Sequence, residues 1–154
     1  MPTTQEQEAK SVDTQSNAGN RLVVLYDGEC GFCNRSVQYI EKRDPKAHFF
    51  YAPLQGEYGT RVLADHPEYQ GINSMLLVEE RGDAKPLVMD RSTAVLRIFR
   101  KLGGVHRVIS YALIIPKFLR DLFYRLIAAN RMRISKAMGT CKMPSASLRS
   151  RLLD

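Results

Sequence analysis

Hydrophobic and polar positions divide the chain into short segments of two kinds. Apolar runs at 22–26, 47–52, 73–79 and 85–89 have the length and composition of strands. Apolar residues at three- and four-residue spacing predict helices over 30–40, 57–65 and 90–102. The predicted order is strand, helix, strand, helix, hairpin, helix. The first crossover makes two strands parallel, and the hairpin lies antiparallel beside them.

This order predicts an α/β fold with a mixed sheet of about four strands, flanking helices and an extra C-terminal helical segment. Residues 1–20 are polar, contain no apolar cluster and are predicted to form a disordered tail. Residues 21–104 are expected to form the core domain. Residues 105–154 are expected to form a basic helical extension packed on that core.

The extension contains an amphipathic segment, 117–129, that admits two interpretations. In the first, its apolar face packs on the domain and its basic face is solvated. In the second, the segment lies on an anionic membrane surface or on a partner. The apolar run 108–115 is too short to span a bilayer, which takes about 20 residues. One face of the segment carries Phe118, Leu119, Leu122, Phe123, Leu126 and Ile127, and the other carries Lys117, Arg120, Asp121 and Arg125.

The net charge of +7 is unevenly distributed. Residues 1–80 hold 7 Lys or Arg and 12 Asp or Glu, a net −5, whereas residues 81–154 hold 16 and 4, a net +12. Such asymmetry suggests an anionic partner for the second half: a membrane surface, an acidic protein or nucleic acid. Nucleic acid is disfavoured because no recognised binding motif accompanies the charge. The pattern indicates no particular oligomeric state.

The clearest chemical signal is a Cys-x-x-Cys at the junction of the first strand and first helix, which is typical of a thioredoxin-like redox site. A helix that begins near Cys30 directs unpaired N–H groups and its positive dipole end at that sulfur, which favours the reactive thiolate. Cys30, Cys33, Val37 and Ile40 share one helical stripe. We therefore expect Cys30 to be exposed and to attack, and Cys33 to be shielded and to resolve the mixed disulfide.

A zinc or iron–sulfur site is the alternative use of such a pair, and it needs two further ligands. Only Cys141 and three isolated histidines are available, so no metal or organic cofactor is predicted. Cys141 itself is either an inert thiol or a third redox cysteine that folds back near Cys30, with Lys142 favouring its thiolate.

Asp27 precedes the pair by three residues and has two interpretations. An aspartate at a turn bonds nearby backbone N–H groups. A buried, partly protonated carboxyl group could instead carry a proton to or from the cysteines. Both roles stay open at this point.

The segment 26–34, Tyr-Asp-Gly-Glu-Cys-Gly-Phe-Cys-Asn, resembles the opening motif of the DCC family of thiol-disulfide oxidoreductases, which is named for one Asp and two Cys. Those three residues correspond to Asp27, Cys30 and Cys33. A basic segment at 129–131, then Cys141 and Pro144, and the final 151–154 resemble that family's C-terminus. The resemblance spans roughly residues 21–154 and implies a thioredoxin-like fold and a redox role.

One departure from the thioredoxin-like pattern concerns the strand that leads into the hairpin. That fold normally has a cis-proline there, facing the cysteines, and this chain has Ile72, Asn73, Ser74 and Met75 instead. Asn73 or Ser74 is expected to supply the substrate contact, across a trans peptide bond.

The sequence thus predicts an enzyme: a thiol-disulfide oxidoreductase that acts on protein or small-molecule disulfides through Cys30 and Cys33. An odd number of cysteines and the lack of an apolar leader favour the cytoplasm, with peripheral membrane contact as an option. The alternative is a thioredoxin-like adaptor that docks on a membrane surface or protein through its basic C-terminal helices. A third option is glutathione-linked exchange through Cys30 alone.

Overall fold

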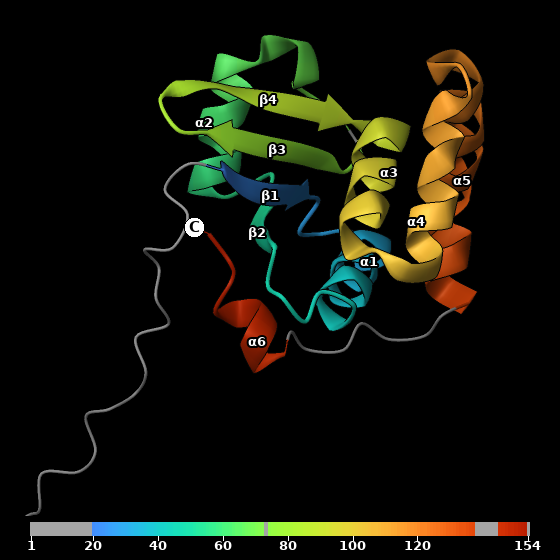
Figure 1. Cartoon of the computed structure of the whole chain (residues 1–154), viewed down its shortest axis with the longest axis horizontal. Helices are drawn as coiled ribbons and strands as arrows, with labels where there is room; N and C mark the ends of the chain where they lie inside the picture. Colours follow the sequence, from blue (N-terminus) through green and yellow to red (C-terminus); the bar gives the residue numbers. More distant parts are fainter. Residues whose placement is uncertain (1–19, 73, 138–144, 154) are drawn as a thin grey trace, which may run out of the picture.

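The computed structural model describes residues 20–72, 74–137 and 145–153 (Figure 1). The elements of its core are β1 (Asn20–Tyr26), α1 (Gly31–Lys42), β2 (Phe49–Pro53), α2 (Glu57–Asp65), η1 (Pro67–Tyr69), β3 (Leu76–Arg81), β4 (Ala84–Asp90) and α3 (Arg91–Leu102). The elements that follow are α4 (Gly104–Ser110), η2 (Tyr111–Ile114), α5 (Lys117–Ala137) and α6 (Ala146–Arg149).

The four strands form one mixed sheet in the order β2-β1-β3-β4. β1 and β2 run parallel, and β3 pairs antiparallel with both β1 and β4. The predicted α/β class, the parallel first crossover and the adjacent hairpin are therefore confirmed. The predicted strand boundaries differ from these by up to three residues.

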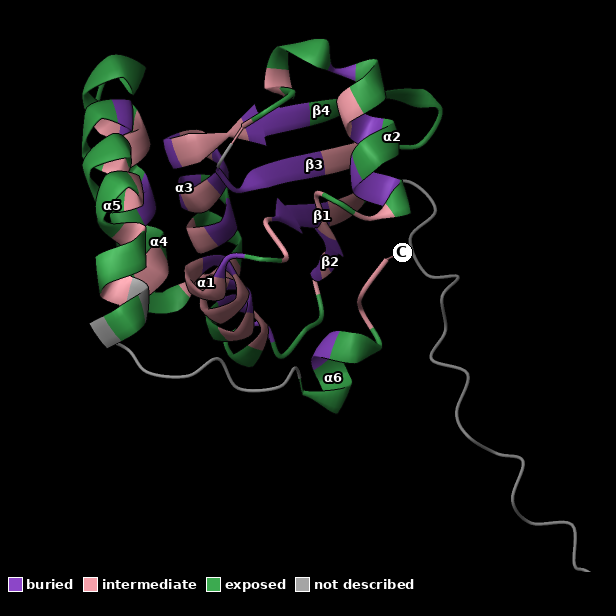
Figure 2. Ribbon diagram, turned by 180° about the vertical axis from the view of Figure 1, so that it is seen from behind, coloured by how far each residue is buried: buried purple, intermediate pink, exposed green. Residues whose placement is uncertain are grey.

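Alternation along the strands gives the sheet two buried faces. On β1, Val24 and Tyr26 face the cluster that includes residues of α1, α3 and α6, whereas Val23 and Leu25 face the cluster that includes α2. The result is three layers, with helices on both sides of the sheet (Figure 2). Gly59 lets α2 lie close to β2, since a Cβ atom there would sit 2.4 Å from the carbonyl oxygen of Pro53.

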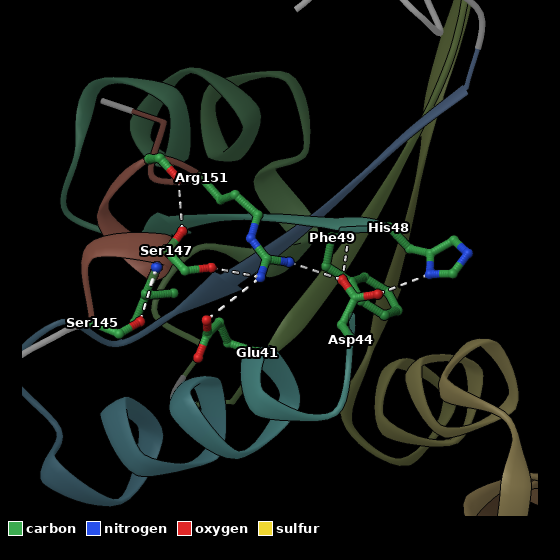
Figure 3. A network of polar contacts seen from close by, with 9 residues as sticks. Glu41, Asp44, His48, Phe49, Ser145, Ser147 and Arg151 are labelled. Carbon is green, nitrogen blue, oxygen red and sulfur yellow. Dashed lines mark hydrogen bonds and ion pairs between the residues drawn. The ribbon is translucent and has the colours of Figure 1, made fainter. Parts of the chain in front are cut away.

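A polar network joins the end of α1, the start of β2 and the C-terminal segment (Figure 3). The carboxylate of Asp44 is 1% exposed and accepts hydrogen bonds from the Phe49 N–H at 3.0 Å and from Arg151 at 3.1 Å, and it pairs with His48 at 2.8 Å. Arg151 also lies 3.5 Å from Glu41. This network was not predicted from the sequence.

The same segment extends the sheet beyond its β2 edge. Tyr51 donates its N–H to the carbonyl oxygen of Arg151 at 3.0 Å and accepts the N–H of Leu153 at 2.8 Å. Leu152 forms an isolated parallel bridge with Tyr51. The C-terminal residues that resemble the DCC family therefore close one edge of the sheet.

Two glycines with positive φ form the junction of α3 and α4: Gly103 at 74° caps the C-terminus of α3, and Gly104 at 57° is the first residue of α4. Beyond them, α5 lies against α1 and α3 (Figure 1). None of the helices in the described ranges is both long enough and apolar enough to cross a membrane.

The orientation of α5 bears on the two interpretations of its amphipathic pattern. The first, in which the apolar face packs on the domain, does not fit, because the side chains of that face are 38% to 77% exposed, with Ile127 at the border of the space between α5 and the domain. The inward side is mixed: Tyr124 and Ala128 line the space between α5, α1 and α3, and Asp121 is buried, binds Lys117 at 2.7 Å and accepts a hydrogen bond from Ser92 of α3 at 2.5 Å. Lys117 also lies 3.3 Å from Asp90, so charged and polar contacts attach α5 to α3.

Candidate active site

The turn between β1 and α1 is held by its own backbone and by the end of β2. Cys30 donates its N–H to the carbonyl oxygen of Asp27 at 3.2 Å. The carboxylate of Asp27 accepts hydrogen bonds from the Glu29 N–H at 3.1 Å and from the Gln55 amide at 2.9 Å. Gln55 also accepts the N–H of Gly28 at 3.1 Å. These contacts are those of a turn-capping aspartate, and Gln55 is a partner that sequence reasoning missed.

Cys30 is the residue that caps the N-terminus of α1. Its backbone is extended, and its Sγ accepts the N–H of Cys33 at 3.4 Å. The side chain of Asn34 donates to the carbonyl oxygens of Gly28 at 2.9 Å and Cys30 at 3.2 Å, which fixes the turn relative to the helix. The sequence Cys-Gly-Phe-Cys-Asn thus folds so that one sulfur lies at the helix end, where unpaired N–H groups gather.

Both sulfurs are largely covered by the protein. Cys30 is 7% exposed and Cys33 is 8% exposed, and both belong to the cluster that contains Val37 and Met75. The expectation of an exposed Cys30 is therefore wrong. The physical reason is the capping geometry: the Cys30 side chain turns back over the helix end to accept the Cys33 N–H, and this brings it into the core. The two cysteines form no disulfide in this structure.

Burial has the largest effect on Cys33 and raises its pKa to about 12. The hydrogen bond and the charge of Cys30 add to the rise, whereas Arg131 on α5 and the backbone of Asp27 oppose it. Cys33 is therefore a neutral thiol at physiological pH, and it needs a proton acceptor before it can attack a disulfide.

A cavity of about 310 Å³ lies between α1, α3 and α5, with Cys33 in its wall. Arg131 and Ser74 are among its few polar neighbours. Burial raises the pKa of the Tyr124 hydroxyl, which also borders the cavity. Most of its lining is apolar and includes Phe32, Met75, Ile98, Phe99, Tyr124 and Ile127.

Of the remaining residues predicted for the site, the structure describes Ser74 but not Asn73 or Cys141. Ser74 is buried and borders this cavity, and its Oγ has no hydrogen bond of good geometry. Asn73 and Cys141, the second of which was a candidate third redox residue, lie outside the described residues. The described residues contain no cis peptide bond. Within those same ranges, no three His, Cys, Asp or Glu side chains gather where they could bind one metal ion.

The model of the family described as DCC1-like thiol-disulfide oxidoreductase matches residues 24–137, which include the turn, both cysteines and α5. The chain belongs to this family. The DCC1-like match confirms the family resemblance and supports thiol-disulfide oxidoreduction as the class of chemistry.

Two curated relatives extend the comparison. The "Uncharacterized protein YuxK" of Bacillus subtilis is 34% identical over 141 residues, which cover 91% of this chain and 98% of the relative. The "DCC family protein At1g52590, chloroplastic" of Arabidopsis thaliana is 29% identical over 126 residues, 80% of this chain and 70% of the relative. No solved structure matches the chain.

Proposed function

We propose that this protein exchanges thiols and disulfides through Cys30 as the attacking group and Cys33 as the resolving group. The observation that carries the assignment is the hydrogen bond from the Cys33 N–H to the Cys30 Sγ at the start of α1. Hydrogen bonding to sulfur at a helix N-terminus stabilises the thiolate, which is the nucleophile. For Cys33, burial outweighs the opposing backbone contact of Asp27 and keeps the thiol protonated.

The proposed reaction has two steps. The Cys30 thiolate attacks one sulfur of the substrate disulfide, and the other sulfur leaves as a thiolate with the electron pair. Cys33 then loses its proton and attacks the Cys30 Sγ, which releases the second substrate thiolate and leaves a Cys30–Cys33 disulfide. Two electrons pass from the protein to the substrate, and an external thiol restores the dithiol.

The lining of the cavity indicates which kind of chemical group the substrate carries beside its disulfide. In the mixed disulfide, the group attached to Cys30 lies beside Cys33, and Cys33 is part of the cavity wall. Because that lining is mainly apolar, we propose that the substrate presents an apolar group next to its disulfide. This group would contact Phe32 and Met75.

Trapping experiments test the order of attack. We expect Cys33→Ser to form a stable mixed disulfide with 5-thio-2-nitrobenzoate after one exchange. We expect Cys30→Ser to lose turnover of a disulfide substrate by at least about a hundredfold, because the nucleophile is removed. Cys141→Ser tests the third thiol: turnover stays unchanged if Cys141 is inert and falls if Cys141 takes part in the exchange. Equal turnover in wild type and Cys30→Ser would end the proposal.

We also propose a test of Asp27 as a proton carrier for the cysteines. The hydrogen bonds that its carboxylate accepts from the Glu29 N–H and the Gln55 amide account for a capping role alone. Asp27→Asn keeps the acceptor oxygen for the Glu29 N–H and removes the titratable group. If Asp27 carries the proton of Cys33, this variant slows release of the mixed disulfide and changes the pH profile of that step. If it only caps the turn, the profile is unchanged.

A further inference from the structure

Exposed apolar side chains are concentrated in one part of the molecule. The described residues include fifteen large hydrophobic side chains that are exposed, and all except Tyr39 and Leu87 lie between Val105 and Met132. Folded proteins keep such side chains scattered, and a contiguous group marks an interaction surface. Figure 2 shows the exposed residues along α5, with the less exposed strip turned toward α3.

The outer face of α5 is formed by the apolar residues that the amphipathic pattern identified. Leu122 is 54% exposed, Leu126 is 55% exposed and Phe118 is 77% exposed. The leading segment adds Val105 at 71% and Ile114 at 84%. The inner side of α5 is already occupied, because Asp121 binds Ser92 and Lys117. The outer face therefore has no partner within the described part of the chain.

The charge around this face is almost entirely positive. Residues 104–137 hold seven Lys or Arg and one acidic residue, Asp121, a net charge of +6. On α5, Arg133 lies seven residues after Leu126, so it continues the same stripe two turns along, and Arg125 borders Leu122. Asp121 is buried and paired, so it supplies no acidic group to the outer surface.

The exposed apolar side chains and the positive charge together indicate which partner binds the outer face of α5. A second copy of the chain would bring two positively charged surfaces together, and residues 104–137 offer no acidic group on this face to pair with them. Residues 1–19 are polar and offer few apolar side chains to cover it. A lipid surface with anionic headgroups accepts both components, since Phe and Leu enter the acyl boundary while Arg and Lys contact the headgroups.

We propose that the outer face of α5 docks in the plane of an anionic bilayer surface. The helix has 21 residues and is about 31 Å long, and it lies along the membrane rather than across it. The helix that docks on the membrane also forms one wall of the cavity beside Cys33, because Tyr124, Ile127 and Arg131 of α5 border that cavity. The docking does not depend on thiol chemistry.

The full chain can be tested with vesicles of phosphatidylcholine, with and without about one third phosphatidylglycerol. We expect at least about tenfold stronger co-sedimentation with the anionic vesicles, and weaker binding when salt is raised from about 0.05 M to about 0.5 M. Replacement of Leu122 and Leu126 together by Gln should reduce binding at least about tenfold, because both side chains enter the lipid. Leu87→Gln removes an exposed apolar side chain of β4 and is the matched control.

Fluorescence gives a second, independent readout, because the chain has no Trp. Phe123→Trp places a single reporter on the outer face of α5, and Leu87→Trp places one on β4. Anionic vesicles should shift the emission of the first variant to the blue, and brominated lipids should quench it, whereas the second variant should not respond.

Three outcomes would overturn the proposal. One is the absence of partition to anionic vesicles in lipid excess. Another is equal vesicle binding by wild type and the Leu122/Leu126 double variant when both have the same melting temperature. The third is a dimer, measured by light scattering, that the double variant loses while wild type fails to bind vesicles, which would assign the face to a second copy.

Discussion

Helices α3 and α5 are both amphipathic, but α3 turns its apolar face toward the sheet whereas α5 turns its apolar face toward solvent. α3 packs its apolar side against the sheet and buries Ala94 and Ile98 completely. α5 lies outside that layer, attaches through Asp121 and Lys117, and presents Leu122 and Leu126 outward. The difference teaches that apolar periodicity identifies a helix and its two faces but does not decide which face meets the domain. That choice depends on the surface available to each helix.

The largest expected difference between the two helices is in the cost of truncating an apolar residue. Ile98→Ala leaves a cavity in the core and should lower the free energy of unfolding by about 2–5 kcal/mol. Leu126→Ala on α5 removes a side chain that is 55% exposed and should change it by less than about 0.5 kcal/mol. Urea denaturation measures both. Similar losses in the two variants would mean that the α5 face is covered in solution.

The next largest effect concerns the polar attachment of α5. Asp121→Ala leaves the buried Ser92 hydroxyl without its acceptor and should cost about 1–3 kcal/mol. Asn130→Ala is the control, since Asn130 is exposed and bonds only within its own helix among the contacts described, to the carbonyl oxygen of Leu126. Limited proteolysis within α5 should accelerate in the first variant and not in the second. An unchanged cleavage rate in Asp121→Ala would show that α5 is held by other contacts.

Acid should weaken this attachment before it affects α1. Burial acts to raise the pKa of Asp121, but the hydrogen bonds from Lys117 and Ser92 outweigh it and hold the pKa below its usual value. A lowered folded-state pKa gives stabilisation that is present above about pH 4 and is lost as the pH falls through the folded value. Hydrogen exchange, corrected for its intrinsic pH dependence, should show α5 losing protection relative to α1 as the pH falls below the usual carboxyl pKa of about 4. Asp121→Asn should abolish that difference.

The smallest effect links α5 to the cysteines. Arg131 lowers the pKa of Cys33 against the larger effect of burial. Arg131→Gln should therefore raise that pKa further and slow alkylation of Cys33 by roughly twofold in a background that lacks the other two cysteines. Arg133→Gln changes an exposed arginine two residues away and should leave the rate unchanged. Equal rates in all three proteins would exclude an influence of α5 on the thiol.

The core fold followed from local signals in the sequence. The apolar runs around Val24 and Leu77 gave the strands, and α2 begins and ends at the predicted residues, Glu57 and Asp65. The helix start beside Cys30 was predicted correctly because Asp27 and Gly28 interrupt the strand. Non-local contacts could not be predicted in this way: Arg151 and Asp44 are separated by 107 positions, and no spacing rule connects them.

The sequence predicted which cysteines form the candidate site but not how deeply they are buried. The pair Cys30 and Cys33 was identified from spacing alone, yet the burial of Cys30 depends on how its side chain turns to accept the Cys33 N–H. Gln55 was missed because it lies after a different strand, and only the parallel pairing of β1 and β2 brings it to Asp27. The cavity was missed because it is made by three helices distant in sequence.

The contact between Arg151 and Asp44 has a consequence for how the chain folds during translation. Asp44 is synthesised 107 residues before its guanidinium partner. Until then, the outer edge of β2 lacks the pairing that Arg151 and Leu153 provide to Tyr51, and an unpaired strand edge can recruit other chains. We expect nascent chains that stop before residue 151 to depend most on chaperone protection at that edge.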